Sequence, residues 1–142
     1  MKYIDAVTLV IFDSEYQVFL LKELSENLDL GKNKDVLGFP ATVVAPDEDD
    51  NQAIARLITK EIGQPVQMHP IPVAEHIIQV SQLVIARLVV YMGYSDSLFG
   101  ARPSDRYIQH YGWMYPYHFL ELPSEETRKG AKQVLRAYLA IK

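Results

Sequence analysis

The sequence contains no cysteine, one tryptophan, and no apolar run as long as the roughly 18 residues of a membrane-spanning helix. The lack of cysteine excludes disulfides and thiolate metal sites. Because the N-terminus also lacks a basic segment followed by an apolar one, we predict a cytoplasmic protein without membrane association. The 14 Lys and Arg are fewer than the 18 Asp and Glu, and the net charge of −4 argues against broad nucleic-acid binding.

The composition predicts a single domain, because 142 residues of which 49% are apolar can form a substantial core. Runs of β-branched and aromatic residues predict strands. Strands are expected at 5–12, 17–21, 36–39, 42–44, 82–94 and 107–115, with two short extended pieces inside 65–80. The first two strands are expected to form a hairpin, and the last to be kinked near Gly112.

The segment 38–63 is predicted to hold the central helix. Asp49 is a suitable N-cap, and Gln52 three residues later completes a capping box. Gly63 is a typical C-terminal glycine, and Pro65 prevents the helix from continuing. Apolar residues recur at helical spacing: Ala53, Ile54, Leu57, Ile58 and Ile62. A second helix is expected from Ser124, as N-cap, to about residue 141. These elements predict an α+β fold, with a mixed sheet in an α/β/α sandwich.

The same segment carries Glu48, Arg56, Glu61 and Gly63, with an apolar residue at 58. This spacing resembles the Nudix box of the Nudix (MutT-like) hydrolases, G-x5-E-x7-R-E-U-x-E-E-x-G-U, where U is a bulky apolar residue. The box is degenerate: Thr42 replaces its first glycine, Leu57 and Lys60 replace two glutamates, and Gln64 replaces its last apolar residue. The order of elements along nearly the whole chain is also similar to a Nudix domain, so the resemblance implies a Nudix-like fold over 1–142.

The resemblance also implies a metal site at the helix. In the family, carboxylates at the positions of Leu57, Lys60 and Glu61 hold Mg²⁺, which bridges a diphosphate and activates water. Helical spacing places these three positions on one face. Their formal charge here is 0, because Lys60 offsets Glu61 and Leu57 is neutral. We therefore expect a weak Mg²⁺ site at most. Glu48 and Arg56 are expected to tie the loop to the helix.

Three functions fit these residues. The favoured one is a pseudoenzyme that binds a nucleotide, another phosphorylated metabolite or a protein partner, with little or no hydrolysis and no cofactor. The alternative is a divergent Mg²⁺-dependent pyrophosphohydrolase acting on a nucleoside diphosphate linked to another group. In that enzyme Glu61 and Glu48 are catalytic, Glu61 is the metal ligand, and a later carboxylate, Glu75 or Asp105, completes the site. The third is a structural module, such as a homodimer.

Candidate ligand-binding residues come from the helix and the last strand. Lys60 and Arg56 are suited to bind a phosphate. Tyr111 and Trp113 are suited to stack a nucleobase. Five aromatic residues have the same parity and would share one face of a continuous strand: Tyr107, Tyr111, Trp113, Tyr115 and Tyr117. Packing under the last helix is the favoured interpretation of that face, and a nucleobase-stacking surface or a dimer surface rich in Tyr and Trp are the alternatives.

Overall fold

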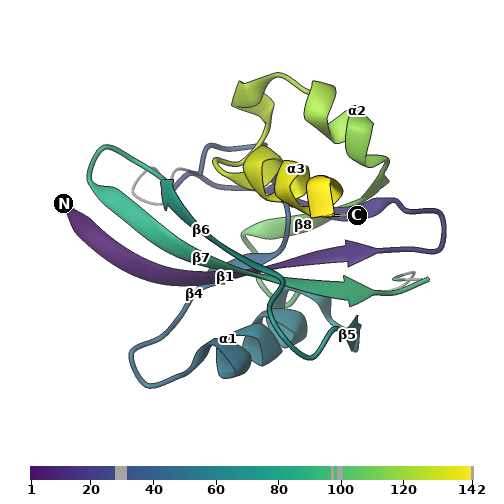
Figure 1. Ribbon diagram of the computed structural model, residues 1–142, viewed down its shortest axis with the longest axis horizontal. Helices are drawn as coiled ribbons and strands as arrows, with labels where there is room; N and C mark the ends of the chain where they lie inside the picture. The colour runs from purple at the N-terminus through teal and green to yellow at the C-terminus, as the bar shows by residue number, and fades with distance from the viewer. Residues whose placement is uncertain (28–31, 97, 99–100, 142) are drawn as a thin grey trace.

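The computed structural model describes residues 1–27, 32–96, 98 and 101–141, which form one eight-stranded mixed sheet with helices on both faces (Figure 1). The strands are β1 (Lys2–Phe12), β2 (Val18–Glu23), β3 (Leu37–Gly38), β4 (Ala41–Val43), β5 (Gln67–Met68), β6 (Ala74–Gln79), β7 (Val84–Tyr94) and β8 (Ile108–Met114). The helices are α1 (Asp50–Leu57), a π-helix (Ile58–Ile62), α2 (Pro116–Glu121), a 3-10 helix (Ser124–Glu126) and α3 (Ala131–Ile141). No helix in this part of the chain is long and apolar enough to cross a membrane.

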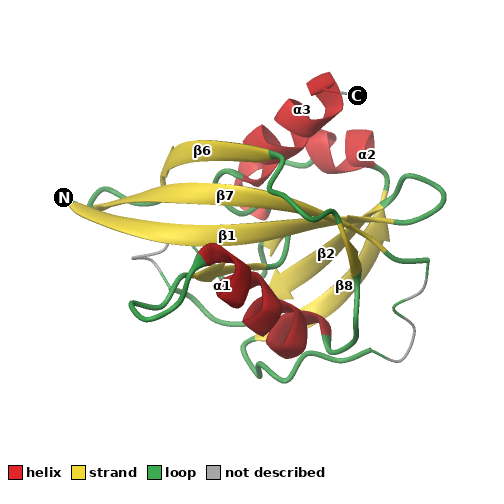
Figure 2. Ribbon diagram, turned by 60° about the horizontal axis from the view of Figure 1, so that its bottom comes forward, coloured by secondary structure: helices red, strands yellow, loops and turns green. Residues whose placement is uncertain are grey.

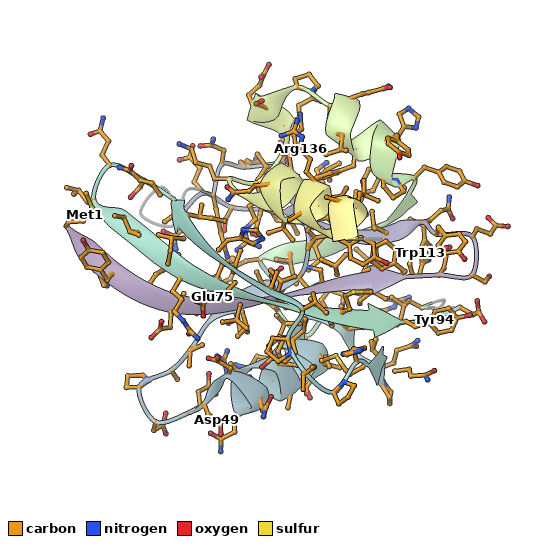
Figure 3. The ribbon with its side chains drawn as sticks, in the orientation of Figure 1. Met1, Asp49, Glu75, Tyr94, Trp113 and Arg136 are labelled. Carbon is orange, nitrogen blue, oxygen red and sulfur yellow. The ribbon has the colours of Figure 1, made fainter. Side chains whose placement is uncertain are left out.

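Strand β1 is the centre of the sheet. It pairs in parallel with β7 from Lys2 opposite Val84 to Phe12 opposite Tyr94, so Met1 and Tyr94 lie at opposite ends of the sheet (Figure 3). On its other side β1 bonds to β4 and, at its end, to β2 in the expected hairpin. Two strands thus share this side of β1: β4 pairs with its middle and β2 with its end. Strand β2 in turn pairs with β3 and β8.

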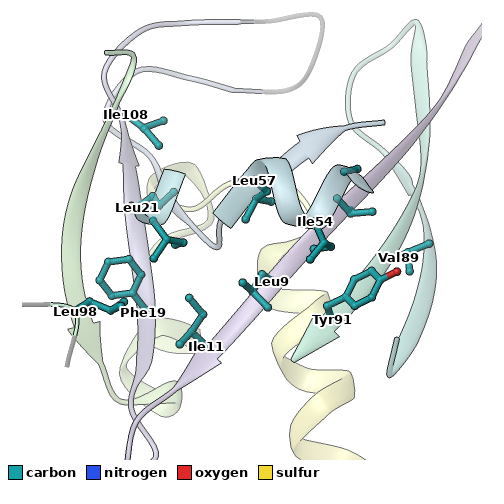
Figure 4. Close-up of a cluster of buried hydrophobic side chains, with 13 residues drawn as sticks. Leu9, Ile11, Phe19, Leu21, Ile54, Leu57, Val89, Tyr91, Leu98 and Ile108 are labelled. Carbon is teal, nitrogen blue, oxygen red and sulfur yellow. The ribbon is translucent and has the colours of Figure 1, made fainter. Parts of the chain in front are cut away.

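Two apolar cores lie on the two faces of the sheet, which confirms the α/β/α sandwich (Figure 2). On one face, alternate residues of β1 pack against α1; Leu9, Ile54 and Leu57 meet there (Figure 4). On the other face, Phe119 of α2 and Leu135 of α3 are fully buried. The apolar residues of α3, Ala131, Val134, Leu135, Tyr138 and Leu139, recur at helical spacing and form the face that packs on this core.

The start of the C-terminal helix was predicted wrongly. Ser124 begins only a 3-10 helix, and α3 starts at Ala131. Two features prevent one continuous helix. The N–H of Arg128 donates to the carbonyl of Leu37 at 2.8 Å, which draws this segment against β3. Gly130 has φ +86°, a left-handed conformation that ends helical geometry. Helix α2, which has Pro116 in its first turn, was not predicted from the sequence.

Candidate functional site

Glu48 and Arg56 fasten the loop after β4 to α1. Nε of Arg56 donates to Oε2 of Glu48 at 3.2 Å, and another Arg56 nitrogen donates to the carbonyl of Val43 at 2.8 Å. Oε1 of Glu48 accepts the N–H of Ala45 at 2.9 Å. Hydrogen bonds from Arg56 and Ala45 hold the pKa of Glu48 below its ordinary value. The side chains of Glu48 and Arg56 are therefore both engaged within the loop.

Thr42, at the position of the family's first glycine, fits this loop without backbone strain. It lies in β4 opposite Val7, and the positive φ angles among the described non-glycine residues are at Tyr16 and Asp35. Its hydroxyl accepts a hydrogen bond from Arg56 at 3.1 Å. The glycine's freedom is not needed here, and the hydroxyl adds a contact that glycine cannot make.

The central helix changes from α-helical to π-helical hydrogen bonding before it ends. The predicted capping box at Asp49 and Gln52 is present, and Gly63 closes the helix in the left-handed conformation. Between them, Ile58–Ile62 is a π-helix, in which the N–H of Gly63 donates to the carbonyl of Ile58. A π-turn adds a residue to the turn and rotates the following side chains.

The prediction that positions 57, 60 and 61 share one face of the helix is therefore wrong. Leu57, the last residue of α1, is 1% exposed and its side chain lies in the core between α1 and the sheet (Figure 4). Lys60 is exposed to solvent. Glu61 is 9% exposed and points inward. Lys60 contributes through its backbone, because its carbonyl accepts the N–H of Ser104 at 2.8 Å. The side chains of these three positions therefore do not converge on one point.

Glu61 is buried, and two cations lie nearby. Burial raises the pKa of its carboxyl to about 7, against the opposing effects of Arg128, Lys32 and a hydrogen bond from the N–H of Ala41 at 3.3 Å. The backbone carbonyl of Glu61 also accepts a hydrogen bond from Nε2 of His110 at 2.8 Å. The retained family glutamate is thus held by β4 on one side and β8 on the other.

A second buried carboxylate, that of Glu23, joins the two cations. Its Oε1 lies 3.6 Å from Nζ of Lys32 and 3.5 Å from a guanidinium nitrogen of Arg128. Burial lowers the pKa of Lys32, and repulsion from Arg128 acts in the same direction. We refer to Glu23, Lys32, Glu61 and Arg128 as the charge cluster. Its formal charge is zero with both carboxyls ionised, so its charges compensate one another.

Two cavities meet at the charge cluster, and Lys32 lines both. One, of about 70 Å³, has Lys32, Arg128 and Lys129 beside apolar residues of β1, β6 and β7. The other, of about 480 Å³, has Glu23, Glu61 and Asp105 in its walls with residues of the loop after β2. We call the two together the cationic cleft. Of the later carboxylates, Asp105 therefore lies near Glu61, whereas Glu75 pairs with Arg87 at 2.7 Å on the exposed edge of the sheet.

The residues of the cleft do not fit Mg²⁺. The described part of the chain has no group of three or more His, Cys, Asp or Glu side chains that could hold a metal ion. Glu23 and Glu61 supply hard oxygen donors, but two side-chain cations already lie beside them. An adjacent ammonium or guanidinium group repels a divalent cation strongly in a buried site.

The aromatic residues of β8 do not share one face. A bulge shifts the register, so that Trp113 pairs with Phe19 but His110 pairs with Leu21. Gly112 has φ +117° at this bulge, which confirms the predicted kink. Trp113 packs edge-on against Phe19, with ring centroids 5.3 Å apart, and joins the core. Tyr111 is exposed, and neither Tyr111 nor Trp113 lines the cationic cleft. A dimer surface on the exposed tyrosines stays a prediction.

Three residues of the charge cluster were missed by the sequence analysis: Glu23, Lys32 and Arg128. Glu23 ends a strand in which most side chains are buried, and this position was the one local signal. Lys32 and Arg128 lie in connecting segments far apart in the chain. The predicted binding residues Arg56 and Lys60 lie outside the cavity walls, Arg56 in the loop contact and Lys60 in solvent.

The sequence matches no family model and no curated protein. Solved structures are similar over nearly the whole chain. A Nudix hydrolase from Nitrosomonas europaea has a TM-score of 0.79 at 19% identity, covering 99% of this chain and 91% of that one. A MutT protein from Methanosarcina mazei has a TM-score of 0.75 at 17% identity, covering 99% and 95%.

A third similar structure is a Nudix domain that was solved with a ligand. It is the Nudix domain of Shewanella oneidensis NrtR complexed with ADP ribose, with a TM-score of 0.74 at 12% identity, covering 100% of this chain and 90% of that one. Together with the sheet order, the loop contact of Glu48 and Arg56 and the helix that follows it, these similarities lead to one conclusion. The chain has the Nudix fold.

Proposed function

We propose that this chain is a Nudix-fold binding domain that holds a phosphorylated metabolite, such as a nucleotide, and hydrolyses it little or not at all. The observation that carries the proposal is the charge cluster. Glu61, at a family metal-ligand position, has Arg128 and Lys32 as its neighbouring cations, and Glu23 is paired with both. Side-chain cations thus supply positive charge beside Glu61, where the family carries a carboxylate that binds Mg²⁺.

The walls of the cleft support a ligand with an anionic part and an apolar part. Lys32, Arg128 and Lys129 line one side, and a guanidinium group with nearby ammonium groups is well suited to phosphate oxygens. Ile78 and Leu88 lie in the same wall and offer apolar contact to the rest of the ligand. The ADP ribose in the NrtR domain belongs to this chemical class.

The alternative function, a Mg²⁺-dependent hydrolase, requires Glu61 to bind metal with help from Asp105, which lines the same cavity. The burial of Glu61 disfavours it, because a carboxyl with a pKa of about 7 is partly protonated near neutral pH. Lys32 and Arg128 disfavour it again by repelling the metal ion.

Calorimetric titration with ADP ribose and with AMP, each with and without Mg²⁺, tests the proposal. We expect binding that does not require Mg²⁺ and that weakens about tenfold or more in Lys32→Met, since one charge-assisted contact is lost. Lys34→Met is the matched control, because Lys34 is exposed and lies outside the cleft walls. Mg²⁺-dependent phosphate or AMP release that disappears in Glu61→Gln would establish the hydrolase instead.

A further inference from the structure

A separate cavity of about 530 Å³ lies at the carboxyl ends of the parallel strands β1 and β7. Its walls contain four aromatic rings from four elements: Phe12, Tyr16, Tyr94 and Tyr138. The cationic cleft borders residues 4–8 of β1, whereas this cavity begins at Phe12, so the two do not share a residue. Its volume is within the range of small-molecule pockets, and carboxyl ends of parallel strands are frequent ligand sites. We call it the aromatic pocket.

Two rings of the aromatic pocket are packed against each other, and the other two are exposed to solvent. Phe12 is buried and stacks on Tyr138 of α3, with ring centroids 4.4 Å apart. Tyr16, from the turn between β1 and β2, is 63% exposed, and Tyr94, at the end of β7, is 40% exposed. Met68 and Met92 also line the wall and add polarisable contact.

Carboxylates lie at this pocket. Asp13 is in its wall together with His69, and no Lys or Arg is among the described residues that line it. Asp96 accepts a hydrogen bond from the Tyr94 hydroxyl and others from Ser14, and these bonds hold the pKa of Asp96 below its ordinary value. Asp96 therefore stays ionised beside the Tyr94 ring. The wall of this pocket thus lacks the Lys and Arg side chains that line the cationic cleft, and it disfavours phosphate.

The turn that carries Tyr16 is held in place before any ligand binds. Oδ1 of Asp13 accepts the N–H groups of Glu15 at 3.0 Å and Gln17 at 2.8 Å. Tyr16 has φ +62°, and its N–H donates to the carbonyl of Asp13 at 3.1 Å. The contacts of Ser14 with Asp96 tie this turn to the end of β7. A preorganised wall lowers the ordering cost of binding.

We propose that the aromatic pocket binds an organic cation with a methylated ammonium group. Aromatic faces attract such a cation through their quadrupoles, and the carboxylates of Asp13 and Asp96 compensate its charge. A methylated ammonium is also easier to desolvate than a bare ammonium group, which holds water by hydrogen bonds. The methyl groups contact the rings and the methionines. This proposal is independent of phosphate binding in the cationic cleft.

Calorimetry and NMR titration with tetramethylammonium and choline test the charge requirement. The control ligand is 3,3-dimethyl-1-butanol, which has the shape of choline without its charge. We expect choline to bind at least about tenfold more tightly than this neutral isostere, because both cation–π attraction and charge compensation are lost. Equal affinity would overturn the proposal and assign the pocket to neutral apolar ligands, and no binding of either cation would also overturn it.

Variants of the rings locate the site. Tyr16→Asn removes a ring while keeping a residue that tolerates positive φ, and Tyr94→Leu removes the second exposed ring. Each is expected to weaken cation binding roughly 3- to 30-fold, and Tyr94→Phe is expected to weaken it less because the ring remains. Tyr117→Leu, on an exposed residue outside the pocket, is the control. Unchanged affinity in folded Tyr16→Asn and Tyr94→Leu proteins would exclude this site, and Lys32→Met should leave cation binding unchanged.

Discussion

The carboxylate of Glu23 at the end of β2 lies 3.5 Å from the guanidinium group of Arg128, which stands just before α3. The same arginine donates to the carbonyl of Phe39 at 3.3 Å, so its side chain joins β2 to the segment between β3 and β4. Arg128 thereby brings the C-terminal part of the chain to the site that the central helix borders. Its position lets one residue act both in the fold and in the proposed phosphate contact.

The pKa of Glu61 predicts how stability depends on pH. The folded-state pKa, about 7, lies above the ordinary value of 4.5, so between these pH values the folded protein keeps a proton that the unfolded chain releases. Stability is therefore expected to fall as pH rises through this window and to stay lower above it. Glu61→Gln removes the ionisation and should be more stable than the wild type at pH 8 by up to about 3 kcal/mol.

Urea denaturation of both proteins at pH 5 and pH 8 checks this expectation. The difference between them should be small at pH 5, where Glu61 is largely protonated in the folded state. Comparing the variant with the wild type cancels the contributions of all groups that the two proteins share. The same pH dependence in both proteins would show that Glu61 titrates normally, with Arg128 and Lys32 outweighing its burial.

Leu57→Glu restores a family glutamate but is expected to damage the core. Leu57 is 1% exposed, so the substitution buries a carboxyl among apolar side chains and should cost at least about 3 kcal/mol. Leu57→Met, which conserves volume, should cost less than about 1.5 kcal/mol. Lys60→Glu should change stability by less than about 1 kcal/mol because Lys60 is exposed. Chemical denaturation measures all three, and a stable Leu57→Glu protein that binds Mg²⁺ would contradict the assigned register.

Thr42→Gly also restores a family residue and is also expected to destabilise. It removes the hydroxyl that accepts from Arg56 at 3.1 Å and adds backbone freedom in a strand. The combined cost should be about 1 to 2 kcal/mol. Thr42→Val, which loses only the hydroxyl, should lie between this variant and the wild type in thermal denaturation. A gain in stability from glycine would mean that β4 is strained at this position.

Gly130→Ala tests the close approach between the start of α3 and β6. Gly130 has φ +86°, and a Cβ there would lie 2.4 Å from Cδ1 of Ile78, so the variant should lose more than about 1 kcal/mol. Ile78→Val removes that methyl group. A double-mutant cycle should therefore show that Gly130→Ala costs less in the Ile78→Val background. An equal cost in both backgrounds would leave the backbone conformation alone as the cause.

The ends of the central helix were predicted correctly because short-range contacts determine them. The capping box at Asp49 and Gln52 and the glycine at 63 gave the correct ends of the central helix, because each acts over one helical turn. The π-turn inside the helix had no such signal, and it decided which side chains face the core. The start of α3 was missed because a contact between Arg128 and Leu37, distant in the chain, displaced it.

The candidate site depended on contacts of the same long-range kind. Glu23, Lys32 and Arg128 meet Glu61 only because the sheet and its connections bring three distant segments together. The expected aromatic face failed for a related reason. The extra residue of β8, between His110 and Gly112, is Tyr111 itself, so the strict alternation of sides on which parity counting depends is broken at that residue.

The parallel pairing of β1 with β7 has a consequence for biosynthesis. The edge of β1 that bonds to β7 finds its partner at residues 84–94, after most of the chain has been made. At a usual translation rate, that edge waits roughly 4 to 16 seconds for β7 to be synthesised. During this interval the apolar strand is exposed to other nascent chains and chaperones. Charged residues near the start of β1 would therefore protect the nascent chain from aggregation through this edge. Lys2 and Asp5 lie there.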